Sequence, residues 1–328
     1  MKAITYQQPQ DTFSLAELPL PQLHTEFDVL VKVHAVGLNP VDSKVNFWHG
    51  MVENMNDSFV GGLDVSGEIV STGEAVTNWK VGDRVLYHGN MRRSHGGFAE
   101  YAVQDSRTLT PHPAISAELA AATPCAAWTA YRALVDKLNI AERSSLFIVG
   151  GAGGVGSFAI QLAKLFGVKN IIATSSKVNH EYLSMLGATH TIDYQSEDVI
   201  ARVMEITEHK GVDVALDCVG GDNDVIAASV LGFEGELVEL VKTVNPTVYP
   251  DAFLKGLSFH QLSLGSGHVN GEIGRATIVN AGKAVSKLLE TGELTVPELK
   301  VISLEQVGDA LLDIRNQRTV GKVVAKIA

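Results

Sequence analysis

Cysteine is almost absent from this sequence, which contains only Cys125 and Cys218. Two cysteines so far apart provide neither a disulfide framework nor a Cys-x-x-Cys metal pair. The eleven histidines form no His-x-x-x-His pair on an expected helix, so this second common source of metal ligands is missing as well. We therefore expect a cytoplasmic protein without a metal site.

Positive charge is also scarce, since the sequence contains 26 Lys and Arg but 37 Asp and Glu, which gives a net charge of −11. An acidic surface has no electrostatic attraction for nucleic acid or anionic lipid, so we expect neither as a partner. The net charge does not exclude a local basic patch. The start of the sequence lacks the apolar region of a signal peptide. The longest uncharged window, 144–163, contains five glycines and is interpreted as a buried strand, turn and helix rather than a membrane span.

The glycines in that window form the most informative motif of the chain. A short apolar run, 146–149, leads into Gly151-x-Gly153-x-x-Gly156, and apolar residues at helical spacing follow. Strand, tight turn and helix in this order are the setting of the dinucleotide-binding fingerprint, and a plain flexible loop would not have this periodic flank. The first glycine permits the turn, the second lets backbone approach a pyrophosphate, and the third lets helix pack on strand. The predicted phosphate loop comprises Gly151, Ala152, Gly153, Gly154, Val155 and Gly156.

The end of the next expected strand indicates which dinucleotide is bound. An NAD enzyme usually places Asp or Glu there, about 20 residues after the glycines, to bind the ribose 2′-hydroxyl. This chain has Ser175, Ser176 and Lys177 instead. No carboxylate repels a phosphate, while two hydroxyls and an ammonium can bind one. The sequence therefore favours NADP(H) over NAD, the alternative being a polar loop with one solvated lysine.

The pattern of apolar residues changes along the chain. About the first 110 residues are β-rich, and an alanine-rich helix is expected from Ser116. From Ser145 on, strands alternate with helices, which predicts a parallel sheet covered on both faces. The expected strands are 27–36, 64–73, 81–87, 96–103, 146–149, 171–174, 190–192, 213–217, 236–240, 259–264, 301–302 and 323–325. The expected helices after Ser145 are 155–166, 178–186, 197–209 and 276–289.

Taken in order, these features and a set of short motifs resemble the medium-chain dehydrogenase/reductase superfamily. Within it, the chain is similar to the zinc-free quinone oxidoreductases, the branch that includes zeta-crystallin. The motifs extend over nearly the whole chain and are far more specific together than singly. They are 36–42 (VGLNPVD), 62–67 (GLDVSG), 81–85 (VGDRV), 96–101 (GGFAEY), 129–134 (TAYRAL), 187–189 (GAT), 217–220 (DCVG) and 321–324 (GKVV).

The resemblance implies an α/β fold with two domains. A GroES-like β-barrel catalytic domain would comprise 1–120 and 271–328. A Rossmann domain with a doubly wound parallel sheet would bind NADP(H) over 121–270. The resemblance also favours a homodimer, in which the sheet edge near 259–264 pairs across a two-fold axis.

The zinc ligands of the superfamily's alcohol dehydrogenases are mostly replaced here. The first ligand position falls in 38–42, which contains no cysteine, and the His-Glu pair reads Leu63-Asp64. Cys125 falls at the position of the late ligand, but one thiolate cannot form a three-ligand catalytic site. Cys125 is therefore interpreted as a small buried residue.

The resemblance implies further cofactor contacts. Thr129 would lie near the nicotinamide, and Tyr194 would lie against the adenosine or its phosphate, unless it is a surface aromatic that closes a loop. The ribose and carboxamide would be lined by Val219, Leu240, Ser263 and Leu264.

Three residues of the expected barrel are candidates for catalysis. Asn39 is a candidate to hold the cofactor ribose or a substrate carbonyl, or else a turn residue before Pro40. Asp42 is a candidate to orient it, or else a helix N-cap. Tyr87, at the end of a strand, is a candidate donor to the substrate, and the adjacent His88 is a weaker one.

Two aromatic residues between the expected strands are also of interest. Phe47 and Trp48 are candidates for an aromatic wall against a planar substrate, and core packing is the alternative.

The chemistry expected without a metal is reduction of a conjugated acceptor. Alcohol oxidation would require a strong general base, and no Tyr-x-x-x-Lys pair is present for that role. We therefore expect an NADPH-dependent enzyme that transfers hydride to quinones or α,β-unsaturated carbonyls. The alternatives are a zinc-free alcohol dehydrogenase, another enoyl reductase on the same scaffold, or a protein that binds NADPH without turnover.

Overall fold

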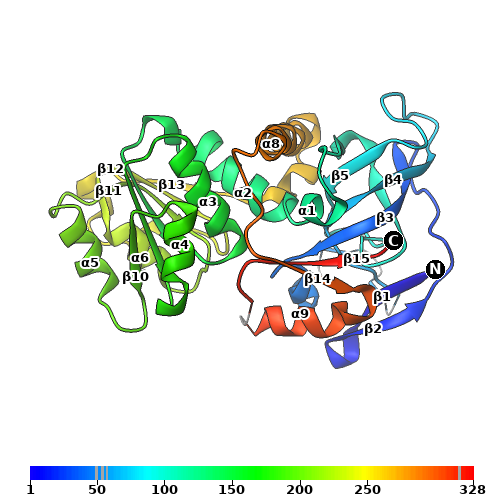
Figure 1. Ribbon diagram of the computed structural model, residues 1–328, viewed down its shortest axis with the longest axis horizontal. Coiled ribbons are helices and arrows are strands. Elements are labelled where there is room, and N and C mark those ends of the chain that lie inside the picture. The colour runs from blue at the N-terminus through cyan, green and yellow to red at the C-terminus, as the bar shows by residue number, and fades with distance from the viewer. Residues whose placement is uncertain (49–50, 53–54, 57, 317–318) are drawn as a thin grey trace. The chain divides into compact units, whose positions relative to one another are not determined.

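The computed structural model describes residues 1–48, 51–52, 55–56, 58–316 and 319–328 (Figure 1). The chain divides into two compact units. Unit 1 comprises Met1–Trp128 and Leu264–Ala328, and unit 2 comprises Thr129–Ser263. Both ends of the chain therefore build unit 1, and unit 2 is an insertion within it.

Unit 2 is built around a six-stranded parallel sheet with the order β10-β9-β8-β11-β12-β13. The strands are β8 (Ser145–Val149), β9 (Asn170–Ser175), β10 (His190–Asp193), β11 (Val212–Asp217), β12 (Leu231–Glu239) and β13 (Ser258–Gln261). The helices are α2 (Thr129–Tyr131), α3 (Gly154–Leu165), α4 (His180–Leu186), α5 (Val199–Ile206), α6 (Asn223–Ser229) and α7 (Ala252–Lys255).

The helices of unit 2 cover both faces of its sheet (Figure 1). α3 packs on α4, and α5 packs on α6. Since the strand order reverses at β8 and right-handed crossovers are nearly universal, the two pairs lie on opposite faces. Every residue of β8 is buried, as expected for a central parallel strand. The prediction of a parallel sheet after Ser145 is thus confirmed.

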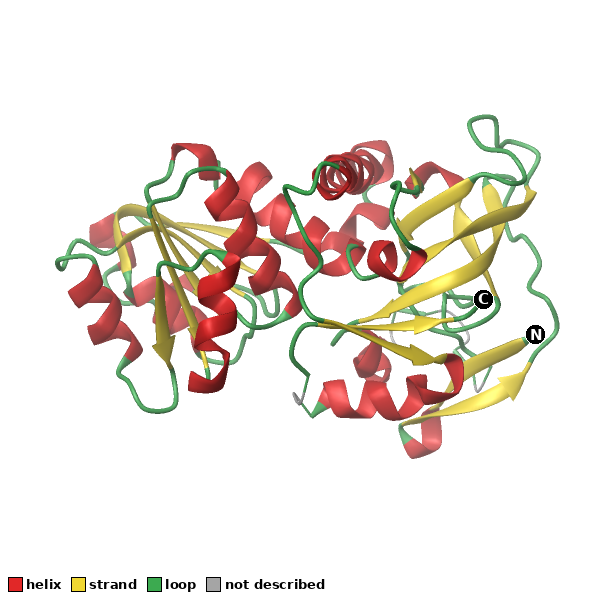
Figure 2. Cartoon of the chain, viewed as in Figure 1, coloured by secondary structure: helices red, strands yellow, loops and turns green. Residues whose placement is uncertain are grey.

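Unit 1 contains a seven-stranded sheet and a separate antiparallel pair (Figure 2). The sheet order is β14-β15-β3-β4-β5-β7, and β6 also pairs with β3; β1 pairs with β2. The strands are β1 (Lys2–Gln7), β2 (Thr12–Glu17), β3 (Asp28–Leu38), β4 (Asp64–Thr72), β5 (Arg84–His88), β6 (Tyr101–Asp105), β7 (Thr110–Pro111), β14 (Leu299–Ser303) and β15 (Lys322–Lys326). The helices are α1 (Ala117–Ala121), α8 (Gly271–Glu290) and α9 (Val307–Arg315).

Most expected strands are shifted by a few residues in the structure, and two of these shifts have a local cause. The strand expected over 96–103 begins only at Tyr101, because the N–H groups of residues 96–98 donate to the carbonyls of residues 60–62, and Gly96 approaches Gly61 more closely than a side chain permits. The close backbone contact therefore replaces strand pairing at Gly96. The strand expected over 259–264 ends at Gln261, since Leu264 begins a helical turn that belongs to unit 1.

None of the helices in the described ranges combines the length and the apolar composition that crossing a bilayer requires.

Candidate functional site

The glycine loop of unit 2 connects β8 to α3. Gly150 has a φ of +81° and turns the chain, while the N–H of Gly151 donates to the carbonyl of Thr174 at 2.9 Å. A Cβ at Gly156 would lie 2.3 Å from the carbonyl oxygen of Gly150, so helix and strand approach more closely than a side chain permits. The turn function assigned to Gly151 was therefore wrong, because the residue with left-handed backbone is Gly150.

Gly153 differs from the other glycines of the loop. It precedes α3 with extended backbone, and its Cβ would make only an ordinary contact of 3.5 Å with Gly150. The protein itself therefore leaves space beside Gly153. At the same end of α3, the N–H groups of Ala152, Gly154 and Val155 have no acceptor within the described chain. Free amides at a helix N-terminus with open space beside them fit the pyrophosphate of a dinucleotide.

The end of β9 carries the three residues predicted to recognise a phosphate. Ser175 is buried, and its hydroxyl donates to the carbonyl of Ser176 at 3.1 Å. The Ser176 hydroxyl is partly exposed and accepts from Asn179 at 3.1 Å, while Lys177 is exposed. The residue of β10 that pairs with Ser175 is Asp193, and its carboxylate accepts a hydrogen bond from the Ser196 hydroxyl at 2.7 Å. Ser176 and Lys177 thus stay the predicted phosphate-binding residues.

The other predicted cofactor residues of unit 2 mostly follow its strands. Val219 follows β11, Leu240 follows β12, and Tyr194 follows β10 with 57% of its surface exposed. Because the strands are parallel, these residues lie at the same sheet edge as the glycine loop. Ser263 follows β13 and is exposed, and Thr129 begins α2 and is buried. The remaining residue, Leu264, is buried in unit 1.

Two carboxyl groups at this edge were not predicted. Asp217 and Glu239 are fully buried, and one oxygen of each accepts backbone N–H groups of the loop that follows it. Burial, and then the interaction with Asp217, raises the pKa of Glu239 to about 7. No sequence signal could find the pair, because it depends on the register of β11 against β12.

In unit 1, the motif 36–42 belongs to a buried polar network. The side-chain amide of Asn39 donates to Asp64 at 2.9 Å and to Asp42 at 3.2 Å, and its oxygen accepts from Lys322. Lys322 is buried and also donates to the carbonyl of Leu38 at 3.1 Å. Burial and the nearby Asp64 raise the pKa of Asp42 to about 7. The side-chain nitrogen and oxygen of Asn39 are therefore both hydrogen-bonded to other residues of the protein. The catalytic roles of Asn39 and Asp42 stay predictions.

Tyr87 lies within the apolar core of unit 1. Its hydroxyl is buried and has no hydrogen-bond partner among the described residues, and burial strongly raises its pKa. The geometry does not support Tyr87 as a donor to a substrate. Phe47 and Trp48 were the candidates for an aromatic wall. Phe47 is exposed, and the side chain of Trp48 is not among the side chains that the structure describes.

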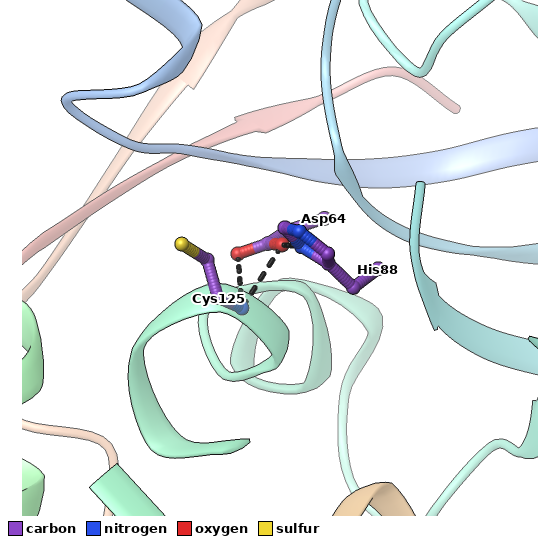
Figure 3. Close-up of side chains that lie close together, drawn as sticks. All are labelled: Asp64, His88 and Cys125. Atoms are coloured by element: carbon purple, nitrogen blue, oxygen red, sulfur yellow. Dashed lines mark hydrogen bonds and ion pairs between the residues drawn. The ribbon is translucent and has the colours of Figure 1, made fainter. Parts of the chain in front are cut away.

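Three side chains of unit 1 come together from different elements, as Figure 3 shows: Asp64, His88 and Cys125. His88 Nδ1 lies 2.9 Å from Asp64 Oδ1, and the backbone N–H of Cys125 donates to both oxygens of Asp64, at 3.0 and 2.9 Å. Burial and the neighbouring Asp64 raise the pKa of the Cys125 thiol well above its usual value. Sequence reasoning gave His88 little weight, because Asp64 lies 24 residues away in the sequence and reaches it only through strand pairing.

Two family models match the chain. The one described as "Alcohol dehydrogenase GroES-like domain" matches residues 25–114, and the one described as "Zinc-binding dehydrogenase" matches residues 154–276. A 2-methylene-furan-3-one reductase of Solanum lycopersicum is 33% identical over 313 residues, which cover 91% of this chain and 71% of that protein. The chain belongs to the medium-chain dehydrogenase/reductase superfamily.

Other relatives in the superfamily are longer than this chain. The synaptic vesicle membrane protein VAT-1 homolog of Danio rerio is 30% identical over 90% of the chain, which spans 63% of that protein. The chloroplastic quinone-oxidoreductase homolog of Spinacia oleracea is 35% identical over 57% of the chain, which spans 58% of that protein. The chain thus spans less than two thirds of the length of these two relatives.

Solved structures of the superfamily have the same fold. The quinone oxidoreductase from Coxiella burnetii has a TM-score of 0.86 and 29% identity, over 100% of this chain and 99% of that one. The quinone oxidoreductase of Escherichia coli, solved in complex with NADPH, is 24% identical with a TM-score of 0.84, over 99% of this chain and 100% of that one, and shows the fold alone. The predicted fold class, an α/β chain with a GroES-like domain and a Rossmann-like parallel sheet, is confirmed.

The family description implies zinc, and the cluster in Figure 3 is where the described residues offer ligand atoms for it. The donor set does not fit. Both oxygens of Asp64 already accept hydrogen bonds from backbone and side-chain groups, including the amide of Asn39. His88 and Cys125 without Asp64 are fewer than the three protein ligands of a catalytic zinc site.

Proposed function

We propose that this chain is an NADPH-dependent oxidoreductase that reduces quinones or α,β-unsaturated carbonyls by hydride transfer without a metal. The observation that carries the proposal is the free, glycine-lined N-terminus of α3 beside a strand end that presents Ser176 and Lys177. The names of the tomato and spinach relatives, a 2-methylene-furan-3-one reductase and a quinone-oxidoreductase homolog, support the reaction class.

The residues of unit 2 have separate tasks in this proposal. The N–H groups of Ala152, Gly154 and Val155 bind the pyrophosphate, and the space beside Gly153 admits it. Ser176 and Lys177 bind the phosphate that distinguishes NADPH from NADH. Val219 and Leu240, at the same sheet edge, contact the cofactor and exclude water. When bound, the cofactor supplies the hydride.

The metal-free mechanism is supported by the oxygens of Asp64, which already accept hydrogen bonds from Asn39 and from the backbone of Cys125. A conjugated acceptor needs no Lewis acid, because the charge that hydride addition creates is delocalised onto a remote oxygen. One hydrogen-bond donor or an ordered water at that oxygen then suffices.

The deciding experiment follows NADPH oxidation with 9,10-phenanthrenequinone, 1,4-benzoquinone and a simple enone, with NADH in parallel. We expect turnover with at least one acceptor, a preference for NADPH, and no change after treatment with EDTA or addition of Zn²⁺. Turnover that requires zinc and an alcohol substrate would favour the alternative of an alcohol dehydrogenase. Tight NADPH binding without turnover of any acceptor would favour a non-catalytic protein.

We also propose that the chain is a homodimer paired through β13. This strand ends the sheet order of unit 2, so one of its edges has no strand partner in the described chain. The neighbouring segments expose Phe233, Phe253 and Leu254, the last two at 95% and 78%. An unpaired edge with exposed apolar side chains favours association. Light scattering of the purified chain tests this, and a monomer at all concentrations would contradict it.

The remaining partner assignments are proposals as well. The net charge of −11 supports small-molecule substrates and no nucleic acid. A cytoplasmic location is proposed from the same composition, although the spinach relative is named as chloroplastic.

A further inference from the structure

We propose that Asp217 and Glu239 are positioning residues of the cofactor site: they hold two loops that support the phosphate loop, and unit 2 binds NADPH tightly only while Glu239 is neutral. This inference rests on the function proposed above and deepens it, because it makes the affinity of the same cofactor site depend on pH. All the residues involved lie in unit 2.

Strand register brings the two carboxyl groups together. Asp217 is the last residue of β11, Glu239 is the last residue of β12, and the two are partners in the parallel ladder. Neighbouring strands of a sheet lie about 4.8 Å apart, and register partners direct their side chains to the same face. Both residues have no exposed surface. Two carboxyl groups are therefore side by side in the interior of unit 2.

Each carboxyl group is attached to the loop that follows its strand. Asp217 Oδ1 accepts two N–H groups of the loop after β11 (218–221), at 2.8 and 3.1 Å. Glu239 Oε1 accepts two N–H groups of the loop after β12 (240–242), at 2.6 and 2.8 Å. The remaining oxygens, Asp217 Oδ2 and Glu239 Oε2, are buried without a hydrogen-bond partner among the described residues. A movement of either carboxyl group therefore moves its loop.

The two loops support the turn that leads into the phosphate loop. A Cβ at Gly150, the residue that turns the chain, would lie 2.6 Å from a methyl carbon of Val219. In the same way, a Cβ at Gly220 would lie 2.7 Å from a methyl carbon of Val241. Packing is thus continuous from the loop after β12, through the loop after β11, to Gly150. A displacement of the two carboxyl groups therefore reaches the backbone that presents the phosphate-binding N–H groups.

Ionisation of Glu239 is the event that displaces the loops. Burial, and then the interaction with Asp217, raises the pKa of Glu239 to about 7. Glu239 is therefore mostly neutral at pH 6 and mostly ionised at pH 8. Two ionised carboxylates at a buried site repel each other, and movement of one of them toward water relieves the repulsion. Because Glu239 carries the loop after β12, this movement removes support from Gly150.

The other titratable groups around Glu239 keep their charge near neutral pH. Burial raises the pKa of the Cys218 thiol well above its usual value and that of Tyr249 to about 12, so both keep their protons. The ammonium of Lys242 lies 2.9 Å from Asp224, and this contact raises the pKa of Lys242. Of the groups described around the pair, Glu239 is thus the one whose charge changes between pH 6 and pH 8.

The test is the Kd for NADPH at pH 6 and pH 8, measured by fluorescence titration well below the Tm. About a tenth of the wild-type chains have a neutral Glu239 at pH 8, so we expect the Kd to rise about tenfold. Glu239→Gln is neutral at both pH values, and its amide oxygen can still accept the two N–H groups. Asp217→Asn removes the opposing charge instead. Both variants should therefore show less than about a twofold change.

Two controls isolate the effect of the carboxyl pair. Glu234→Gln neutralises an exposed carboxylate of β12 and should show the same rise as the wild type. NADH is titrated in parallel, because the additional phosphate of NADPH itself takes up a proton near pH 6. The rise should occur with both cofactors. A pair that only stabilises the fold would lower the Tm of its variants without giving the folded wild-type chain a pH-dependent Kd.

The outcomes separate this inference from the proposed function. A wild-type Kd that is equal at both pH values, or that rises as much in Glu239→Gln as in the wild type, refutes the inference alone. A chain that binds NADPH with the expected pH profile but reduces no acceptor refutes the proposed function alone. A chain that binds no NADPH at either pH refutes both.

If neither variant folds, hydrogen exchange of the wild-type chain gives the answer. The amides of the loops 218–221 and 240–242 should lose protection between pH 6 and pH 8, after correction for the intrinsic exchange rate. The amides of β8 should keep their protection, because this central strand is buried throughout. Equal protection of the two loops at both pH values refutes the inference.

Discussion

Asp217 and Glu239 are register partners at the carboxyl ends of β11 and β12, and both are fully buried. Each uses one oxygen to hold the loop that follows its strand. Asp217 Oδ2 and Glu239 Oε2 have no hydrogen-bond partner in the described chain. The two carboxyl groups still affect each other electrostatically, since Asp217 contributes to the raised pKa of Glu239. Two adjacent buried carboxylates repel, so protonation of Glu239, whose pKa is raised, relieves that repulsion. The pair holds the loops of Val219 and Leu240, which we assign to cofactor binding.

This pair predicts a loss of stability at alkaline pH. The pKa of Glu239 is raised to about 7 in the folded chain, above its ordinary value of 4.5. Its protonation therefore favours the folded state fully below pH 4.5, and this contribution is lost as the pH rises through 7. We expect a lower Tm at pH 8 than at pH 6, and a smaller difference for Glu239→Gln, whose amide can donate to Asp217. Glu234→Gln, at an exposed position of β12, should behave like the wild type. An equal pH dependence in Glu239→Gln would show that Glu239 is not the group responsible for the loss of stability.

The two glycines of the phosphate loop should respond differently to alanine. In Gly156→Ala, the methyl group would lie 2.3 Å from a backbone oxygen, so we expect a loss of about 1–3 kcal/mol in the free energy of unfolding. Gly153→Ala has space within the protein and should fold normally, but its methyl group would occupy the place that we propose for the pyrophosphate. We expect at least about a tenfold rise in its Kd for NADPH, equivalent to about 1.4 kcal/mol. Urea denaturation and fluorescence titration measure the two effects. Normal NADPH binding by Gly153→Ala would refute the assigned phosphate site.

Lys177 should control the choice of cofactor. Lys177→Ala removes the exposed ammonium from the end of β9, and we expect about a tenfold higher KM for NADPH with little change for NADH. Lys169→Ala, another exposed lysine of unit 2, is the control and should affect neither cofactor. Steady-state kinetics with both cofactors give the answer, and a parallel loss for NADH would show that Lys177 does not bind the additional phosphate.

The buried network of Lys322 should matter more for stability than for chemistry. Lys322→Met leaves Asn39, Asp42 and Asp64 buried without their cation, and removal of one partner of a buried charged group typically costs about 3–5 kcal/mol. Lys326→Met removes an exposed lysine of β15, whose ion pair with Glu118 should contribute less than about 1 kcal/mol. Urea denaturation of both variants tests the difference, and similar midpoints would show that the network is not a structural element.

The sequence predicted the elements whose signals are local. The strand at Leu146, the glycines and the helix after them are adjacent in the chain, so periodicity and composition were sufficient for β8 and α3. The turn was assigned to Gly151 rather than Gly150, because a motif gives glycine spacing but not the backbone angle. The hairpin of β1 and β2 was not predicted.

The polar groups of the site could not be predicted in the same way. The contacts between His88 and Asp64, and between Asp217 and Glu239, depend on strand register over more than twenty residues. Tyr87 was chosen because it ends a strand, but the pleat directs its side chain into the core and leaves its neighbour His88 beside the carboxylate. A one-residue difference along a strand thus separates a buried phenol from a candidate donor.

The position of β15 imposes an order on folding during synthesis. This strand lies between β14 and β3, so the sheet of unit 1 lacks an interior member until Lys322–Lys326 has emerged from the ribosome. Unit 2 is complete in the nascent chain once Ser263 has emerged, about sixty residues earlier. All residues of unit 2 have therefore been synthesised while β3 still lacks its neighbour β15. An early stop codon between Ser263 and Lys322 would keep every residue of unit 2 but remove β15 from the sheet of unit 1.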